Sequence, residues 1–102
     1  MTDATHPRHH LNETIHAPVR FSIMAALVGA DQAEFAFIGD TVQVSDSMLS
    51  KQLAAVEAGL VKVRKGYVGK RPRTWLSLTP TGRRAFADHV DALREIAGGG
   101  YK

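Results

Sequence analysis

The stretch Ser45–Gly59, with the sequence SDSMLSKQLAAVEAG, decides the fold. At helical spacing, one apolar stripe runs through this stretch and just beyond it, formed by Leu49, Leu53, Val56 and Leu60. The opposite side carries only short or cationic side chains, namely Ser47, Ser50, Lys51, Ala54 and Ala58. Ser45 is a good N-cap, so the helix start directs free backbone N–H groups and a positive dipole end outward. A helix with this outer face fits a DNA major groove, although the pattern also suits an ordinary solvated helix.

Basic residues gather directly after this helix. The chain of 102 residues has 13 Lys and Arg, 10 Asp and Glu, and a net charge of +3. From Val61 to Ala87 there are eight basic residues and no acidic one: Lys62, Arg64, Lys65, Lys70, Arg71, Arg73, Arg83 and Arg84. Protein surfaces normally intersperse the two signs. A block of one sign beside a small polar helix therefore points to a polyanionic partner.

The basic block contains the pattern of a β-hairpin. Val61 and Val63 alternate with basic residues, which predicts a strand with one apolar and one basic face. The sequence GYVGKRPR (66–73) is punctuated by glycine and proline and predicts a loop, and TWLSL (74–78) predicts the returning strand. We therefore expect a hairpin with a strongly basic tip, and we expect Trp75 to pack between it and the core.

Two helices are predicted before the opening stretch. Pro18 stands where a first helical residue would, and the apolar face that follows extends to Gly29. Around the segment FAFIGDTV (35–42), the sequence predicts a brief strand-like entry at Glu34 and Phe35 and then a two-turn helix over about Ala36–Thr41. Gly39 weakens that helix by up to about 1 kcal/mol relative to alanine. A short connection then joins two helices in a helix-turn-helix arrangement.

The last predicted helix carries a long apolar stripe. Thr79 as N-cap and Pro80 as first helical residue mark its start, and the glycines from Gly98 onward end it. The stripe comprises Phe86, Val90, Leu93, Ile96 and Ala97. It is long for a helix attached to so small a core. We therefore expect these five residues to form a two-fold dimer interface, which would match a palindromic site. Arg83 and Arg84 fit either plain solvation or DNA contact.

Composition excludes several classes of function. A chain of this length supports a single small core, and 44% hydrophobic with 23% charged residues is typical of a soluble protein. No apolar run approaches the roughly 20 residues of a membrane span, and no signal peptide is recognisable, so we expect a cytoplasmic protein without a membrane partner. The absence of cysteine excludes disulfides and thiolate chemistry. His16 and His89 lack a nucleophile or acid at a recognisable spacing, so we expect neither an enzyme nor a cofactor.

The N-terminal segment Met1–Glu13 is polar and contains three clustered histidines, His6, His9 and His10. Imidazole is a common metal ligand. No carboxylate or further histidine spacing completes a site, however. We therefore expect a mobile arm, or a partly ordered lead-in helix, without a metal.

The predicted order of helix, short helix, helix, basic hairpin and helix resembles the winged helix-turn-helix of bacterial and archaeal transcriptional regulators of the MarR and ArsR type. It is more closely similar to the small stand-alone winged-helix proteins of that group. The likeness rests on five motifs within about residues 15–93: HAPVR (16–20), LSKQL (49–53), EAGLV (57–61), GKRPRT (69–74) and LTPTGR (78–83). Segment 35–42 departs from the family, which usually carries a better helix former there.

The resemblance implies an α+β, mainly α fold, a winged helix-turn-helix with three N-terminal helices, a two-stranded wing and a long C-terminal helix. The expected divisions are an arm over 1–14, the DNA-binding domain over 15–79, and a dimerisation helix and tail over 80–102. The resemblance also implies a repressor or activator, usually a homodimer, that binds double-stranded DNA. The recognition helix, about Ser45–Ala58, would lie in the major groove, and the wing along the backbone or minor groove. The implied DNA-binding residues are Ser47, Ser50 and Lys51 on the helix and Lys65, Lys70, Arg71 and Arg73 on the wing.

Two other functions fit the same pattern. A winged helix used as a docking module in a larger assembly would present the basic wing to an acidic protein surface. A single-strand or RNA binder would need exposed stacking aromatics, for which Tyr67 and Trp75 are the candidates near the basic block. The sequence leaves the operator, the regulated genes and any effector open.

Overall fold

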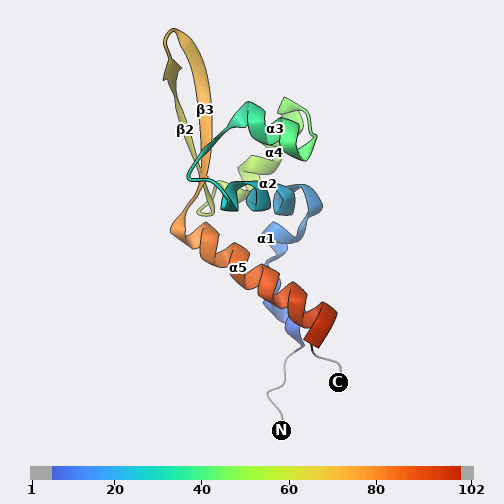
Figure 1. Cartoon of the computed structure of the whole chain (residues 1–102). Helices are drawn as coiled ribbons and strands as arrows, with labels where there is room; N and C mark the ends of the chain where they lie inside the picture. The colour runs from blue at the N-terminus through green and yellow to red at the C-terminus, as the bar shows by residue number, and fades with distance from the viewer. Residues whose placement is uncertain (1–5, 100–102) are drawn as a thin grey trace.

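The computed structural model describes residues 6–99 of the chain. Its elements, in order, are a 3₁₀ turn at Pro7–His10, α1 at Glu13–His16, α2 at Pro18–Val28, β1 at Ala33–Glu34, α3 at Phe35–Val42, α4 at Asp46–Val56, β2 at Val61–Val68, β3 at Arg71–Leu78, α5 at Pro80–Arg94 and a π-helical turn at Glu95–Gly99. Figure 1 shows the hairpin β2–β3 rising beside α3 and α4, while α5 extends from the other end of the body beside the N-terminal segment. This is the expected winged helix, mainly helical with a small antiparallel sheet.

The helix starts follow the local capping signals in the sequence. Ser45 Oγ accepts a hydrogen bond from the backbone N–H of Met48 at 3.2 Å, which caps α4. Pro18 and Pro80 occupy first-turn positions of α2 and α5. The helix ends are less well predicted, because α4 already ends at Val56 and α5 at Arg94. From Glu95 to Gly99 the chain continues as a π-helical turn.

The core joins all the helices longer than two turns to the base of the sheet. The apolar stripe of α4 is buried as expected. The buried cluster comprises Ile15, Ile23, Met24, Leu27, Ile38, Leu49, Leu53, Val56, Val61, Leu76, Leu78 and Phe86. One expectation is wrong here, because Phe86 is a core residue rather than a free interface residue. Its side chain is 9% exposed, and its ring lies 5.3 Å from that of Phe21.

The helix-turn-helix depends on close packing between α3 and α4. Gly39 is buried, and a Cβ added to it would lie 3.5 Å from the Leu49 side chain, an ordinary van der Waals distance, which shows how close the two helices lie. Gln43, with φ 61° and ψ 52°, ends α3 in the left-handed conformation and turns the chain toward α4. The predicted pair of helices is thus confirmed, with α3 starting one residue early.

The hairpin differs from its prediction in two respects. Its strands pair from Val61 with Leu78 to Val68 with Arg71, which leaves only Gly69 and Lys70 as the turn. The expected loop over 66–73 is therefore mostly strand. Gly69 has a φ of 62°, as a tight two-residue hairpin turn requires. In addition, β1 pairs with β3 on its other edge, so the sheet has three strands rather than the two expected.

The start of α5 is fixed against the turn between α4 and β2 by Thr79 and Gly82. The Thr79 hydroxyl donates to the Gly59 carbonyl at 2.6 Å and accepts from the Gly82 N–H at 2.8 Å. Gly59 has a φ of 104°, a conformation that favours glycine. A Cβ on Gly82 would overlap the Leu60 carbonyl. The motifs EAGLV and LTPTGR are therefore the two sides of one contact.

The described part of the N-terminal segment packs along α5 instead of forming a mobile arm. The turn at Pro7–His10 lies beside α5, and the backbone N–H of Asn12 donates to His89 Nδ1 at 2.9 Å. Residues 1–5 of the expected arm lie outside the described residues. Within residues 6–99, no group of three or more histidine, cysteine or acidic residues could hold a metal ion. No helix in the same range is both long and apolar enough to cross a membrane.

Candidate nucleic-acid interface

The outer face of α4 is exposed and carries short side chains. Ser47, Ser50 and Lys51 are all exposed, as the sequence predicts. Ser47 Oγ lies 3.3 Å from Ser45 Oγ, so a local hydrogen bond holds it at the start of the helix. Short side chains let the helix axis approach a surface closely, and Lys51 adds a long cationic donor.

A groove joins α4 to the hairpin. It has a volume of about 300 Å³ and is lined by Phe35, Ser50, Leu53, Glu57, Val63, Lys65 and Thr74. Ser50 of α4 and Lys65 of β2 therefore face one hollow, although they are fifteen residues apart in sequence. Figure 1 shows the helix and the hairpin at the same end of the molecule. One rod-shaped ligand can thus contact both.

The two faces of the hairpin carry different side chains. Because side chains alternate along a strand, the register places Lys65, Tyr67, Pro72 and Thr74 on the face that looks toward α4. We call this the inner face. The opposite, outer face carries Arg64, Gly66, Val68, Arg71, Arg73 and Trp75. The sequence predicts the alternation but not which face turns toward the recognition helix.

Two of the outer-face arginines bind partners within the chain. Arg73 Nε forms an ion pair with Glu34 Oε1 at 3.0 Å. The Arg64 guanidinium lies 4.4 Å above the Trp75 ring and donates to Gln32 Oε1 at 3.2 Å. Trp75 therefore packs within the hairpin, and the expectation that it packs between wing and core is wrong. Arg64 and Arg73 tie the hairpin to the segment around β1.

Other cations near α4 and the hairpin have no such partner. Among the residues described, no acidic side chain pairs with Lys51, Lys65, Lys70 or Arg71. All four are exposed. Four unpaired positive charges on α4 and the hairpin favour an anionic partner at this end of the molecule.

Arg83 has a structural role that the sequence analysis missed. Its guanidinium donates to the carbonyls of Val28 and Ala30, both at 3.1 Å, and so caps the C-terminal end of α2. The contacting residues are more than fifty positions apart in the sequence, so no local motif predicts the contact. Arg84, the neighbouring candidate, is exposed.

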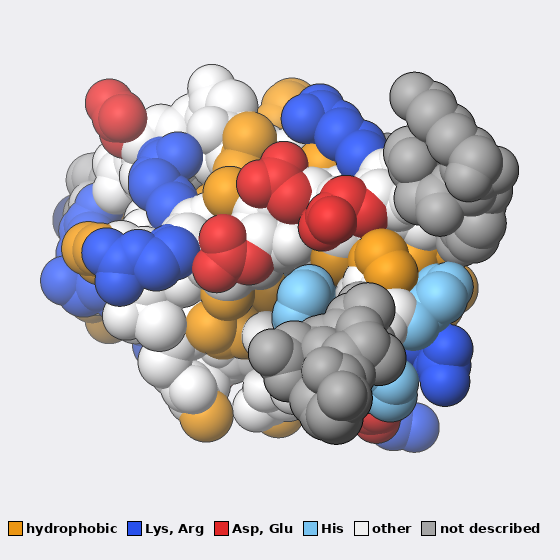
Figure 2. Space-filling model, turned by 90° about the horizontal axis from the view of Figure 1, so that it is seen from below, with side chains coloured by type: hydrophobic (Ala, Val, Ile, Leu, Met, Phe, Trp, Pro, Cys, Tyr) orange, Lys and Arg blue, Asp and Glu red, His pale blue; other side chains and the backbone are white. Residues whose placement is uncertain are grey.

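The underside of the molecule carries a group of acidic side chains. Figure 2, seen from below, shows them near the middle of this face, with Lys and Arg at several places toward its edges. A hollow of about 390 Å³ in this region is lined by His10, Asp88, Asp91 and Glu95. An acidic face repels a polyanion, so the surface suited to nucleic acid is the one formed by α4 and the hairpin.

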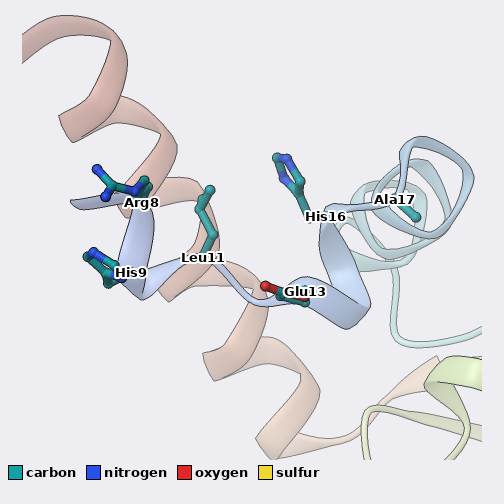
Figure 3. Close-up of a pocket in the computed structure, with 6 residues that line it drawn as sticks. All are labelled: Arg8, His9, Leu11, Glu13, His16 and Ala17. Atoms are coloured by element: carbon teal, nitrogen blue, oxygen red, sulfur yellow. The ribbon is translucent and has the colours of Figure 1, made fainter. Parts of the chain in front are cut away.

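A larger hollow lies at the N-terminal segment. Its volume is about 650 Å³, and its lining residues are Arg8, His9, Leu11, Glu13, His16 and Ala17. Figure 3 shows Arg8 and His9 on one side of Leu11, with Glu13, His16 and Ala17 on the other. The lining mixes basic groups with a carboxylate, which defines no single ligand chemistry.

The fold and this interface define the chain as a winged-helix protein. Residues 19–97 match the family described as winged helix DNA-binding domain, and the chain belongs to that family. The chain is 28% identical over 80 residues to the protein MJ0432 of Methanocaldococcus jannaschii, a match that covers 78% of this chain and 87% of that protein.

Solved structures of transcriptional regulators share the fold. A transcriptional regulator homologue from Pyrococcus horikoshii superposes with a TM-score of 0.81 at 26% identity, over 89% of this chain and 91% of that one. The transcriptional repressor CouR, solved bound to a 23-mer DNA duplex, gives a TM-score of 0.65 at 24% identity, over 91% of this chain and 71% of CouR. MarR-family regulators are among the structures with this fold, which confirms the resemblance drawn from the sequence.

Proposed function

We propose that this protein is a transcriptional regulator that binds double-stranded DNA sequence-specifically as a homodimer. The observation that carries the proposal is the groove in which Ser50 of α4 and Lys65 of the hairpin meet, because it directs both elements to one ligand. The likeness in fold to CouR, whose structure contains a DNA duplex, supports the choice of partner.

The proposed roles follow from the chemistry of each side chain. The recognition helix, α4, enters the major groove, where Lys51 donates to guanine O6 or N7 and Ser47 and Ser50 bond bases or phosphates. Lys65, Lys70 and Arg71 neutralise phosphates or enter a narrow minor groove. Arg73 joins them only when it leaves Glu34.

Dimerisation is proposed through the exposed part of the α5 stripe. With Phe86 assigned to the core, the proposed interface consists of Val90, Leu93, Ile96 and Ala97. Val90, Leu93 and Ile96 are half-buried and Ala97 is exposed within the single chain. A two-fold interface would bury them and would place two copies of α4 on a palindromic operator. In sedimentation, a Leu93→Glu variant should remain a monomer at concentrations where the wild type dimerises. A monomeric wild type at high micromolar concentration would remove the dimer from the proposal.

The DNA-binding proposal is tested by selecting bound duplexes from random DNA at two salt concentrations. A regulator should enrich a palindromic sequence and bind it about 10³-fold or more tightly than random duplex. Its affinity should fall steeply as salt rises. Weak binding that does not vary with sequence would instead support a docking module whose basic wing meets an acidic protein. We place the regulator in the cytoplasm, where its operator would be accessible.

A further inference from the structure

We propose that Tyr67 contacts the duplex directly, and that the inner face of the hairpin, with Lys65 and Tyr67, lies against the DNA beside α4, while Arg71 reaches the DNA backbone from beside the turn. This inference rests on the proposed function. It adds a contact residue that neither the charge pattern nor the family resemblance assigned.

The first observation is the exposure of Tyr67. Its side chain is 72% exposed on the projecting part of the hairpin, and it belongs to none of the described core contacts. Burying a tyrosine ring removes apolar surface from water, so a ring held outward at this point has surface available for a partner. Pro72, opposite Tyr67 in the register, restricts its own φ on the paired strand β3.

The second observation is the direction of the residue. Tyr67 lies two residues beyond Lys65 on the inner face, and Lys65 lines the groove shared with Ser50 of α4. A duplex that follows this groove outward from the helix therefore meets Lys65 and then Tyr67. On the outer face, Arg64 and Arg73 are already bound to Trp75, Gln32 and Glu34, and the unpaired arginine of that face, Arg71, lies beside the turn.

The third observation concerns the kind of nucleic acid. A single strand is usually bound by several aromatic rings on which successive bases stack. On this hairpin the Trp75 ring is covered by Arg64, which leaves Tyr67 as the exposed aromatic side chain of the described hairpin. One ring suits a duplex better: it packs against a deoxyribose while its hydroxyl donates to a phosphate oxygen.

The test uses the full chain and the duplex obtained by selection, labelled with a fluorophore, and measures anisotropy for four proteins. These are the wild type, Tyr67→Ala, Tyr67→Phe and the control Val68→Ala. Val68 is the neighbouring apolar residue on the outer face and is 56% exposed, so it is a matched control for loss of surface at the tip. Melting temperatures of the four proteins establish that each is folded.

We expect Tyr67→Ala to weaken duplex binding about tenfold, because it removes both the ring that packs on the deoxyribose and the hydroxyl that donates to a phosphate. Tyr67→Phe should stay within about threefold of wild type, because the ring remains. Val68→Ala should bind as wild type. Nitration by tetranitromethane gives a second readout: the duplex should protect Tyr67, as judged by peptide mapping.

Three results would overturn the inference: wild-type affinity in Tyr67→Ala, an equal loss in Val68→Ala, or a loss seen with the single strand but not with the duplex. In each of these the wild type still binds the duplex, so the proposed function survives. A wild type that binds no duplex above background would overturn the proposed function, and the inference with it.

Discussion

The backbone N–H of Asn12 donates to Nδ1 of His89 at 2.9 Å, and this bond joins the N-terminal segment to α5. His89 is fully buried, and its other ring nitrogen, Nε2, has no hydrogen-bond partner among the described atoms. Because Nδ1 accepts a hydrogen bond, the proton of the neutral ring resides on Nε2. Burial is the main cause that lowers the pKa of His89 below 6.5. The charge of His16, whose ring lies 5.4 Å from that of His89, is the second cause.

This lowered pKa predicts a loss of stability in mild acid. The unfolded chain takes up a proton on this histidine near pH 6.5, whereas the folded chain resists it. The stabilising contribution of neutral His89 to the free energy of unfolding is therefore fully present above pH 6.5. It is lost as the pH falls toward the lower pKa of His89 in the folded state. Urea unfolding at about pH 7.5 and about pH 5.5 measures the difference.

The variant His89→Phe separates this effect from the other titrating groups. It keeps an aromatic ring in the site but does not titrate, so its free energy of unfolding should depend less on pH than that of the wild type. The exposed histidine in His9→Gln is the control and should leave the wild-type pH dependence unchanged. If His89→Phe kept the full wild-type difference, another group would be responsible.

A second prediction concerns Gly82 at the start of α5. In Gly82→Ala the new methyl group would overlap the Leu60 carbonyl, so the turn before β2 and the start of α5 must move apart. We expect a loss of about 2–3 kcal/mol in the free energy of unfolding, as for other overpacked sites. Urea titration measures this loss.

Gly29 provides the control for Gly82. It has a φ of −86°, and nothing lies within 4 Å of an added Cβ. Gly29→Ala should therefore raise stability by about 0.5 kcal/mol, because it restricts only the unfolded chain. A loss in Gly29→Ala similar to that in Gly82→Ala would mean that the contact with Leu60 does not set the cost.

Gly82 also illustrates what the sequence can and cannot predict. The Thr79–Pro80 signal locates the start of α5, because a capping interaction involves residues close in sequence. The contact of Gly82 with Leu60 joins α5 to the turn before β2 and has no local signature. Alternation predicts strand β2, whereas β1, at Ala33–Glu34, is too short to show a period and is expected only as a brief strand-like entry at Glu34 and Phe35.

In the candidate site, too, local features are predicted from the sequence and long-range contacts are not. The exposure of Ser47 and Lys51 follows from helical periodicity, and it was predicted correctly. The ion pair of Arg73 with Glu34 joins residues 39 positions apart, so charge counting treated Arg73 as free. The orientation of the hairpin faces depends on how β3 packs on the core, which no window of sequence contains.

The third prediction concerns this ion pair. The side chains of Arg73 and Glu34 are 37% and 47% exposed, so the pair contributes less than about 1 kcal/mol to stability. The ion pair should have a larger effect on the affinity for duplex DNA. Glu34→Gln removes a negative charge and releases Arg73, so we expect duplex affinity to rise about threefold at low salt.

The control for Glu34→Gln is Asp88→Asn, which removes one acidic charge on α5, away from the hairpin. An equal gain in the two variants would indicate an effect of net charge alone. A gain in Glu34→Gln that disappears when Arg73→Gln is added would assign the effect to the released guanidinium.

The fourth prediction separates the helix from the hairpin. Lys51 lies on the exposed face of α4, and Arg71 lies beside the hairpin turn. If Lys51 contacts a base, Lys51→Ala should lower the ratio of specific to non-specific affinity, by about 1–3 kcal/mol for the lost contact. If Arg71 contacts a phosphate, Arg71→Ala should weaken all duplexes alike and reduce the slope of log affinity against log salt by about one.

These two variants serve as controls for each other, because each removes one positive charge from an exposed position. Anisotropy titrations with the selected duplex and with a random duplex, at several salt concentrations, give both the ratio and the slope. An equal loss on both duplexes in both variants would contradict the division of roles, since a base contact must distinguish sequences. It would leave α4 as a further phosphate-binding element, and the source of specificity would then lie in the shape of the operator.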